Sequence, residues 1–144
     1  MCGIVGYLGN DDGLAICLSG LKRLEYRGYD SAGLAIVNKQ KLQVIKVVGG
    51  VVNLEKKLNR QQIKGRPVIA HTRWATYGEP IALNAHPHCD CRSQIAVVHN
   101  GIIENYNELK KWLVGQRHQF VSQTDTEVIA HLIEENYQVS GPRL

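Results

Sequence analysis

A short apolar run starts at the second residue of this 144-residue chain and ends in a cluster of turn residues. Residues 2–9 have the length and composition of a buried β-strand, and the segment Gly9-Asn10-Asp11-Asp12-Gly13 is typical of a turn. We therefore expect the fold to begin with a core strand that holds the Cys2 thiol at its first residue. Cys2 is then either a small apolar residue of that strand or a nucleophile near the chain terminus.

The nucleophile hypothesis depends on removal of Met1, which a small second residue usually permits. The thiol and a free α-amino group would then belong to the same residue. Such an amine titrates near ~7.7–8.0, so at neutral pH an appreciable fraction can take the thiol proton, directly or through one water. The rest of the chain must then supply a substrate pocket and an oxyanion hole.

The first half of the chain alternates strand-like and helical segments. Five apolar residues recur at helical spacing behind an Asp or Asn cap: Leu14, Cys17, Leu18, Leu21 and Leu24. Strand-like runs over 33–37 and 42–48 predict a hairpin through residues 38–41, and a short helix is expected over 51–58.

The second half adds short strands over 67–71 and 95–99, separated by a long loop rich in Gly, Pro, Asn and His. Structureless loops of that length inside a domain are usually functional. Two capping-box patterns then precede helical apolar faces, Asn105 with Glu108 and Thr124 with Glu127. The predicted order is β-α-β-β-α-β-β-α-β-α in one domain, without internal repeats or linkers.

Composition excludes several classes of partner. Hydrophobic residues make up 44% and charged residues 21% of the chain, as in ordinary soluble globular proteins. The net charge of +4 comes from scattered basic residues, so no nucleic-acid partner is expected. No apolar run approaches the ~18 residues of a membrane helix, so no membrane partner is expected either. The first residues lack a basic segment, and Asp11 and Asp12 interrupt the opening apolar stretch, so we expect no secretory signal. Four cysteines in a domain of this size predict a reduced, cytoplasmic protein.

Polar residues follow two of the predicted strands. Asn100 and Gly101 can supply an amide and a backbone N–H to an oxyanion hole, although this dipeptide alone is far more often a turn. Arg73 has a planar fork that suits a carboxylate, and Trp74 can cover a bound substrate. The alternatives are a surface ion pair for Arg73 and core packing for Trp74.

Asp125 has a structural and a functional interpretation. As the first helical residue after a Thr124 cap, its carboxylate would be stabilised by the helix dipole. In the functional interpretation it pairs with an ammonium group.

The segment His86-Pro87-His88-Cys89-Asp90-Cys91 contains several residue types that ligate zinc. Structural zinc sites generally use more widely spaced pairs, and four ligands this close on an extended chain would strain to surround one ion. We therefore expect no metal site and no cofactor.

Taken together, six segments resemble the class II glutamine amidotransferases. These are residues 1–6, 24–33, 71–76, 84–88, 99–105 and 124–127. Within that family, residues 26–33 have the sequence Tyr-Arg-Gly-Tyr-Asp-Ser-Ala-Gly. This motif resembles that of the glutamine–fructose-6-phosphate aminotransferases, a branch that makes glucosamine 6-phosphate. The matches run in order from residue 1 to about residue 131.

The resemblance implies an α+β fold of the N-terminal-nucleophile (Ntn) hydrolase type. In this αββα sandwich, two antiparallel sheets lie between layers of helices. The family's glutaminase domain continues beyond Leu144 and is followed by an isomerase domain. We therefore expect residues 1–144 to be the N-terminal part of a glutaminase domain, with an incomplete sandwich and no isomerase domain.

The resemblance also implies roles for individual residues. Cys2 is the nucleophile, Asn100 and Gly101 form the oxyanion hole, and Arg27 helps to orient the nucleophile. The residues expected to bind glutamine are Arg73 at its α-carboxylate, Asp125 and the Gly101 backbone at its α-amino group, and Trp74, Thr76 and Tyr77 in a segment that closes over it. Tyr77 stands where the family usually has His, so we expect altered affinity for glutamine rather than lost catalysis.

The implied reaction is the hydrolysis of L-glutamine to glutamate and ammonia through a γ-glutamyl thioester on Cys2. In a full-length homodimer, the isomerase domain would use this ammonia to convert fructose 6-phosphate. Two alternatives stay open. The chain can be a truncated, non-catalytic binding module, or another class II member such as a phosphoribosylpyrophosphate amidotransferase or an asparagine synthetase, against which residues 26–33 and 85–88 argue.

Overall fold

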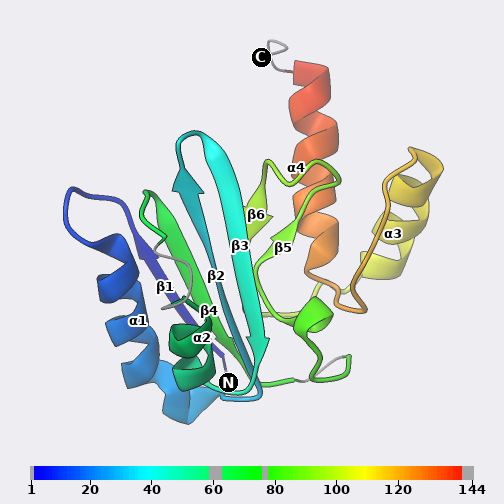
Figure 1. Cartoon of the computed structure of the whole chain (residues 1–144). Helices are drawn as coiled ribbons and strands as arrows, with labels where there is room; N and C mark the ends of the chain where they lie inside the picture. The colour runs from blue at the N-terminus through cyan, green and yellow to red at the C-terminus, as the bar shows by residue number, and fades with distance from the viewer. Residues whose placement is uncertain (1, 59–62, 76–77, 141–144) are drawn as a thin grey trace.

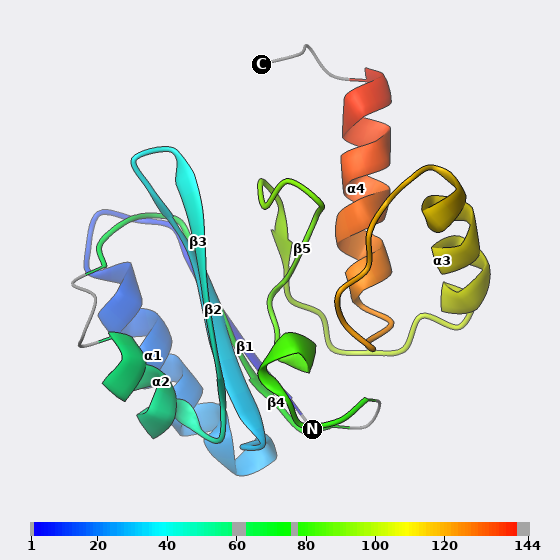
Figure 2. The ribbon, with the colours of Figure 1, turned by 45° about the vertical axis from the view of Figure 1, so that its right-hand side comes forward.

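The fold is a four-layer α+β sandwich, seen in a computed structural model that describes residues 2–58, 63–75 and 78–140. Its elements are β1 (Gly3–Tyr7), α1 (Gly13–Leu24), η1 (Glu25–Arg27), β2 (Ser31–Asn38), β3 (Lys41–Val48), α2 (Val51–Leu58), β4 (Val68–Arg73), η2 (Ala82–Asn84), β5 (His88–Cys89), β6 (Ala96–Val97), α3 (Tyr106–Gly115) and α4 (Glu127–Ser140). Figure 2 shows α1 and α2 on one side, then the main sheet, then the β5–β6 layer, and α4 and α3 on the far side. The predicted α+β sandwich of antiparallel sheets is confirmed.

The main sheet has the strand order β1-β4-β2-β3, with every neighbouring pair antiparallel. As predicted, β2 and β3 form a hairpin, in which Asn38 pairs with Lys41 across a two-residue turn at Lys39 and Gln40. Helices α1 and α2 cover one face of this sheet (Figure 1), and the predicted cap of α1 is Asp12, which accepts the N–H of Ala15 at 3.1 Å. The buried core between them is apolar: Cys17, Leu21, Ala32, Leu34, Ile36, Ile45, Val51, Leu54, Leu58, Val68 and Ala70.

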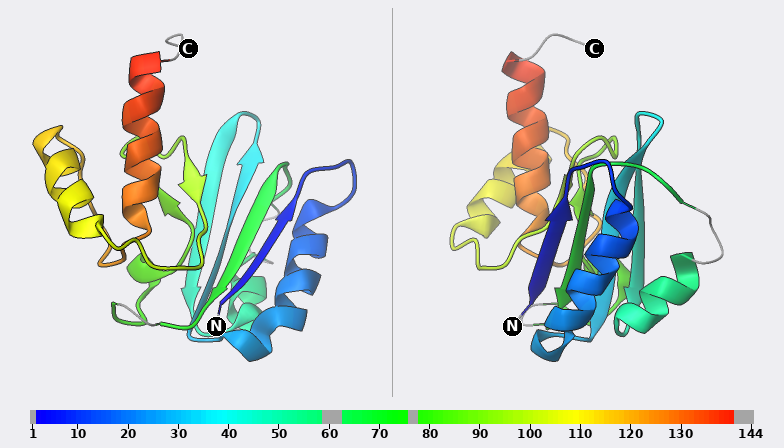
Figure 3. Two further views of the ribbon diagram at one scale, coloured as in Figure 1. Left: turned by 180° about the vertical axis from the view of Figure 1, so that it is seen from behind. Right: turned by 90° about the vertical axis from the view of Figure 1, so that its left-hand side faces the viewer.

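The opposite face of the main sheet meets the two-stranded β5–β6 sheet, with α4 and α3 behind it (Figure 3, left). Here most of the buried side chains are polar: His86, His88, Asp90, His118, Ser122, Thr124, Thr126, Glu127, His131 and Glu134. This layer therefore depends on hydrogen bonds rather than on apolar packing alone.

In four details the second half differs from the sequence prediction. Part of the expected loop forms β5, and none of the described residues between α3 and α4 forms a strand. Asn105 precedes α3 but makes no side-chain capping bond. Helix α4 begins at Glu127, so Asp125 is not its first helical residue.

The late start of α4 has a physical cause. The Glu127 carboxylate accepts the backbone N–H groups of Val121 and Ser122 at 2.8 and 2.7 Å, and the Ser122 hydroxyl at 2.5 Å. The hydroxyl of Thr124 bonds to Ser122 and to His88, at 3.0 and 2.9 Å, instead of capping the helix. These bonds hold the segment before Glu127 as a loop.

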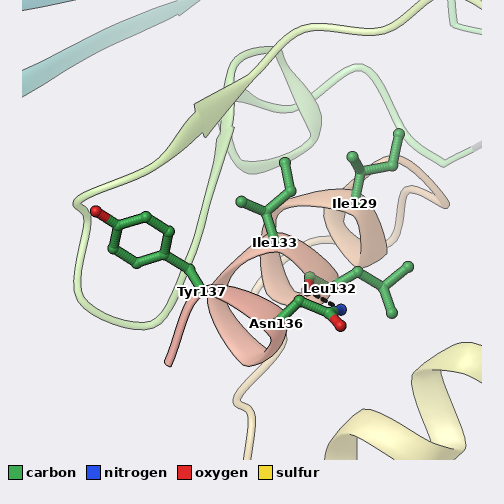
Figure 4. A pocket seen from close by; sticks show the side chains of 5 residues that line it. All are labelled: Ile129, Leu132, Ile133, Asn136 and Tyr137. Carbon is green, nitrogen blue, oxygen red and sulfur yellow. Dashed lines mark hydrogen bonds between the residues drawn. The ribbon is translucent and has the colours of Figure 1, made fainter. Parts of the chain in front are cut away.

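One side of α4 is an exposed apolar surface. Figure 4 shows the side chains that line a shallow pocket of about 430 Å³ along it: Ile129, Leu132, Ile133, Asn136 and Tyr137. Asn136 donates to the carbonyl oxygen of Leu132 at 2.8 Å. Among the described residues, no helix combines the length and the apolar character needed to cross a bilayer.

Candidate active site

The Cys2 thiol lies at the edge of the main sheet, next to the end of β4. The antiparallel register pairs Gly3 with Thr72, which places Cys2 beside the strand end that carries Arg73. The backbone N–H of Trp74 donates to Cys2 Sγ at 3.3 Å. The thiol is therefore held by backbone at the junction of two strands, and its residue is partly exposed.

Asn100 and Gly101 reach Cys2 from the second sheet, because they follow β6. The Asn100 side-chain amide donates to the carbonyl oxygen of Cys2 at 3.2 Å. Gly101 has φ of +149°, and a Cβ there would lie 2.8 Å from Nε2 of His99. Only glycine fits this backbone without strain, so the dipeptide holds a special conformation beside Cys2.

His71 is a site residue that the sequence analysis missed. Its Nε2 lies 2.9 Å from Oδ1 of Asn100. Burial lowers the pKa of His71 to about 4, so the ring is neutral at pH 7 and can donate its Nε2–H to that oxygen. The bond directs the Asn100 NH₂ group toward Cys2. The sequence contained a signal for His71, because residues two apart on a strand share a face of the sheet and Arg73 was already a candidate site residue.

Arg73 is buried, with 4% of its surface exposed, and its guanidinium donates to the carbonyl oxygens of Glu79 and Gly78 at 3.2 and 3.4 Å. Trp74 is 46% exposed and meets the Tyr29 ring edge-on at 5.4 Å between centroids. The surface location considered for Arg73 and the core location considered for Trp74 are therefore wrong. The Thr76 and Tyr77 positions lie outside the described residues.

Arg27 and Asp125, both predicted site residues, also lie near Cys2 and Arg73. Arg27 ends η1, and the next residue, Gly28, approaches β4 so closely that a Cβ would lie 2.9 Å from the backbone of Arg73 and Trp74. Asp125 lies before α4, where its Oδ2 accepts the N–H of Ile103 at 2.7 Å. The carboxylate is thus oriented by the segment that follows Gly101.

Together these side chains line one pocket of about 340 Å³, a volume within the usual range for small-ligand sites. Its lining residues are Cys2, Arg27, Arg73, Trp74, His86, His99, Asn100, Gly101, Ile102, Thr124, Asp125 and Thr126. Every predicted site residue among the described ones is present there. Burial lowers the pKa of His86, so this histidine adds no positive charge at pH 7. The charged side chains of the pocket are the guanidinium groups of Arg27 and Arg73 and the carboxylate of Asp125.

The αββα sandwich and a pocket with a cysteine at the start of its first strand define the Ntn class of amidotransferases. Residues 71–142 match the family described as glutamine amidotransferase domain, and the chain belongs to this family. The confirmed family agrees with the resemblance found in the six sequence segments.

Two curated relatives of this chain share one name. The chain is 55% identical over 141 residues to a glutamine–fructose-6-phosphate aminotransferase (isomerizing) of Pyrococcus horikoshii, covering 98% of this chain and 24% of the relative. It is 54% identical over 138 residues to the enzyme of the same name from Clostridium tetani, covering 96% and 23%. The chain thus spans about a quarter of the length of these curated relatives.

A solved structure gives the same class from the fold. The glutamine phosphoribosylpyrophosphate amidotransferase of B. subtilis, solved with ADP and GMP, superposes with a TM-score of 0.78 at 32% identity. The superposition covers 98% of this chain and 30% of that one.

Proposed function

We propose that this chain hydrolyses L-glutamine to glutamate and ammonia, with Cys2 as the nucleophile. The observation that carries the proposal is the convergence of four complementary groups in one pocket: the Cys2 thiol, the Asn100 amide, the Arg73 guanidinium and the Asp125 carboxylate. These groups match the parts of a glutamine molecule, which has a carboxamide to attack, an α-carboxylate and an α-ammonium group.

The charged groups bind the amino-acid end of glutamine. Arg73 takes the α-carboxylate in its planar fork, and Asp125 with the Gly101 backbone takes the α-ammonium group. This fixes the carboxamide at Cys2, while Arg27 lies beside the nucleophile. Trp74, Thr76 and Tyr77 belong to the segment that covers the bound substrate.

Catalysis begins after Met1 is removed. The free α-amine of Cys2 takes the thiol proton, and the sulfur forms a bond to the carboxamide carbon. Negative charge on the carbonyl oxygen is stabilised by Asn100 and Gly101, and a donor of this kind contributes about 2.7–4 kcal/mol. The C–N bond then breaks as the leaving nitrogen takes the proton back from the α-ammonium group, which releases ammonia. Water hydrolyses the thioester to glutamate and restores the thiol.

His71 acts as a positioning residue in this proposal. It is neutral at pH 7 but directs its Nε2 at Asn100 rather than at the thiol. Its part is to fix the amide of the oxyanion hole, while the terminal amine does the proton transfer.

We further propose that residues 1–144 are the N-terminal part of the glutaminase domain of a longer cytoplasmic enzyme. An isomerase domain of that enzyme, assembled as a homodimer, would use the ammonia to convert fructose 6-phosphate to glucosamine 6-phosphate. The identities of 54% and 55% to aminotransferases, against 32% to the phosphoribosylpyrophosphate enzyme, support this branch over the other class II members.

Ammonia release from glutamine tests the catalytic proposal. Cys2→Ala should lower turnover by about 10⁴–10⁶-fold, the range for loss of a nucleophile, while calorimetry still detects glutamine binding. Cys89→Ala is the matched control, because Cys89 is also a partly exposed free cysteine but does not line the pocket. Substantial turnover by Cys2→Ala would refute the assignment, and a folded wild-type chain that releases no ammonia would support the binding-module alternative.

Intact-protein mass before and after treatment with a glutamine-mimicking alkylating agent tests the terminal amine. We expect a mass without Met1 and one adduct, which Cys2→Ala abolishes. An active chain that keeps Met1 would overturn the proposed base.

A further inference from the structure

A second group of reactive side chains lies on the other side of the β5–β6 layer, outside the pocket. Cys91 is in the loop between β5 and β6, His118 follows α3, and His131 and Glu134 are on α4. One potential ligand atom from each of these residues lies within 4.8 Å of all the others. We propose that these four residues bind one structural Zn²⁺ ion, and we call them the Cys-His-His-Glu cluster.

The spacing of the ligand atoms fits tetrahedral coordination. Cys91 Sγ lies 3.7 Å from Nδ1 of His118 and 3.6 Å from Nδ1 of His131. Glu134 Oε2 lies 3.0 and 3.5 Å from the same two nitrogens. A tetrahedral zinc ion with bonds of about 2.3 Å to sulfur and about 2.0–2.1 Å to nitrogen and oxygen separates sulfur from nitrogen by about 3.6 Å, and nitrogen from oxygen by about 3.3 Å. The cluster already surrounds a space of the size that Zn²⁺ requires.

Both histidines have a carboxylate at the ring nitrogen that faces away from the cluster. Nε2 of His118 lies within hydrogen-bond distance of Oε2 of Glu135, at 3.0 Å, whereas Nε2 of His131 lies 3.5 Å from Oε1 of Glu127 and makes no hydrogen bond to a described residue. Histidines that bind a metal usually donate their second N–H to such a group, which leaves the inner nitrogen free for the ion. The backbone N–H of Gln119 also points to Cys91 Sγ, at 3.4 Å, and would stabilise a thiolate.

The charges also balance. A Cys91 thiolate and the Glu134 carboxylate together neutralise a divalent cation, as a site with three buried residues requires. On binding, the sulfur–zinc bond replaces the sulfur–hydrogen bond, and the proton leaves to solvent. With four protein ligands the coordination sphere is closed, which is the character of structural rather than catalytic zinc.

In the metal-free alternative, the His118 ring pairs with the carboxylates of Glu134 and Glu135, at 3.0 Å from each. That pairing accounts for one histidine. It does not explain why Cys91 Sγ lies 3.6 Å from Nδ1 of His131 as well as 3.7 Å from Nδ1 of His118, whereas one ion accounts for all four residues.

A zinc ion here would join the β5–β6 loop, the segment after α3 and helix α4. These elements flank the residues that carry Asn100 and Asp125 to the pocket. The metal would thus rigidify the polar half of the pocket without touching the substrate.

Zinc binding to the chelator-stripped 144-residue chain tests the proposal, with a competing chromophoric indicator and metal analysis after desalting. We expect about one Zn²⁺ per chain, a higher melting temperature with Zn²⁺, and, with Co²⁺, the absorption of a tetrahedral thiolate complex. Cys91→Ser should weaken binding by at least about 100-fold, and Glu135→Gln by about 10–100-fold, as for a supporting group. Cys91 is exposed, so its substitution leaves the fold intact.

Cys89→Ser is the matched control, because Cys89 is two residues away but outside the cluster. It should bind zinc as the wild type does. The proposal is overturned if the folded wild-type chain takes up no stoichiometric zinc, or if Cys91→Ser binds zinc as tightly as the wild type and Cys89→Ser do.

Discussion

Between the main sheet and helices α1 and α2 lies a cluster of buried apolar side chains, whereas the layer of β5, β6, α3 and α4 buries mostly polar ones. In the first region, leucine, isoleucine and valine side chains fill the space between helices and strands. In the second, histidines, carboxylates and hydroxyls bond to one another and to loop backbone. Two halves of one domain are thus stabilised by different forces, although the pocket takes residues from both.

This difference assigns different tasks to the two halves. Apolar packing is insensitive to pH and fixes the strand ends that carry Cys2 and Arg73. Polar networks are directional and fix the orientation of Asn100 and Asp125, but their strength depends on protonation. The polar half is therefore the part of the molecule that acid, and a bound metal, should affect most.

Leu34→Ala should give the largest loss of stability, because Leu34 is fully buried on β2 at the centre of the apolar half. Loss of the side chain and the cavity left behind should lower the free energy of unfolding by about 2–5 kcal/mol. Urea denaturation at pH 7 and pH 5 should give the same difference from wild type at both values. Leu83→Ala, at a leucine that is 55% exposed, is the control and should change stability by at most about 0.5 kcal/mol. A clear dependence of the Leu34 effect on pH would break the comparison.

Asn100→Ala should strongly reduce activity with little effect on stability. Loss of the proposed oxyanion donor should lower kcat for ammonia release by about 10²–10³-fold. The melting temperature should fall only slightly, because Asn100 is itself exposed and only the Nε2–H of His71 loses its acceptor. Asn136→Ala, on the exposed side of α4, should leave kcat unchanged. A reduction of less than tenfold at Asn100 would show that another group stabilises the oxyanion.

Glu127→Gln tests the polar half. Burial raises the pKa of Glu127, but the neighbouring His131 ring and hydrogen bonds from Ser122 and the backbone outweigh it and hold the pKa at about 2, below the ordinary 4.5. The native state therefore binds fewer protons than the unfolded state between these values. The stability that this carboxylate contributes is fully present above pH 4.5 and is lost as the pH falls toward 2.

Glu127→Gln should consequently be about 1.5–3 kcal/mol less stable than wild type at pH 7, as for hydrogen bonds to a charged group. The gap should narrow as the pH falls below 4.5. Urea denaturation from pH 7 to pH 3, with excess chelator to remove any metal, measures this gap. Glu104→Gln, at an exposed glutamate, should show no gap at either end. A gap that stays constant down to pH 3 would contradict the network.

The sequence predicts the apolar half better than the polar half, for a physical reason. Local patterns were sufficient for α1, whose leucines recur with helical period behind Asp12, and for the β2–β3 hairpin. Apolar periodicity follows directly from which face of an element is buried. In the polar half, the capping box predicted at Thr124 fails because Thr124 bonds to His88, a residue 36 positions away.

For the candidate site too, the sequence predicted the residues in local motifs and missed those that depend on long-range contacts. Its motif residues were found from short segments that resemble a known family, but the hydrogen bond of His71 to Asn100 joins residues 29 positions apart and was missed. The Cys-His-His-Glu cluster was missed because Cys91 was judged only against its near neighbours, while its partners lie on α4 and after α3. A pair of ligands one helical turn apart, His131 and Glu134, was the only local signal of it.

The smallest effect is expected from an ion pair that belongs to the apolar half. Lys22 on α1 lies 2.7 Å from Glu55 on α2, and their side chains are 50% and 29% exposed. Exposed pairs of this kind contribute about 0.2–1 kcal/mol, since water screens them and ordering two long side chains costs entropy. Lys22→Gln should therefore lower the free energy of unfolding only within that range in dilute buffer. The effect should vanish in about 1 M salt, where the screening length is about 3 Å.

Lys111→Gln, at an exposed residue of α3, is the control, because it also removes one positive charge. A salt-resistant loss above about 2 kcal/mol at Lys22 would mean that the apolar half also depends on a charged contact, and the contrast between the two halves would then fail.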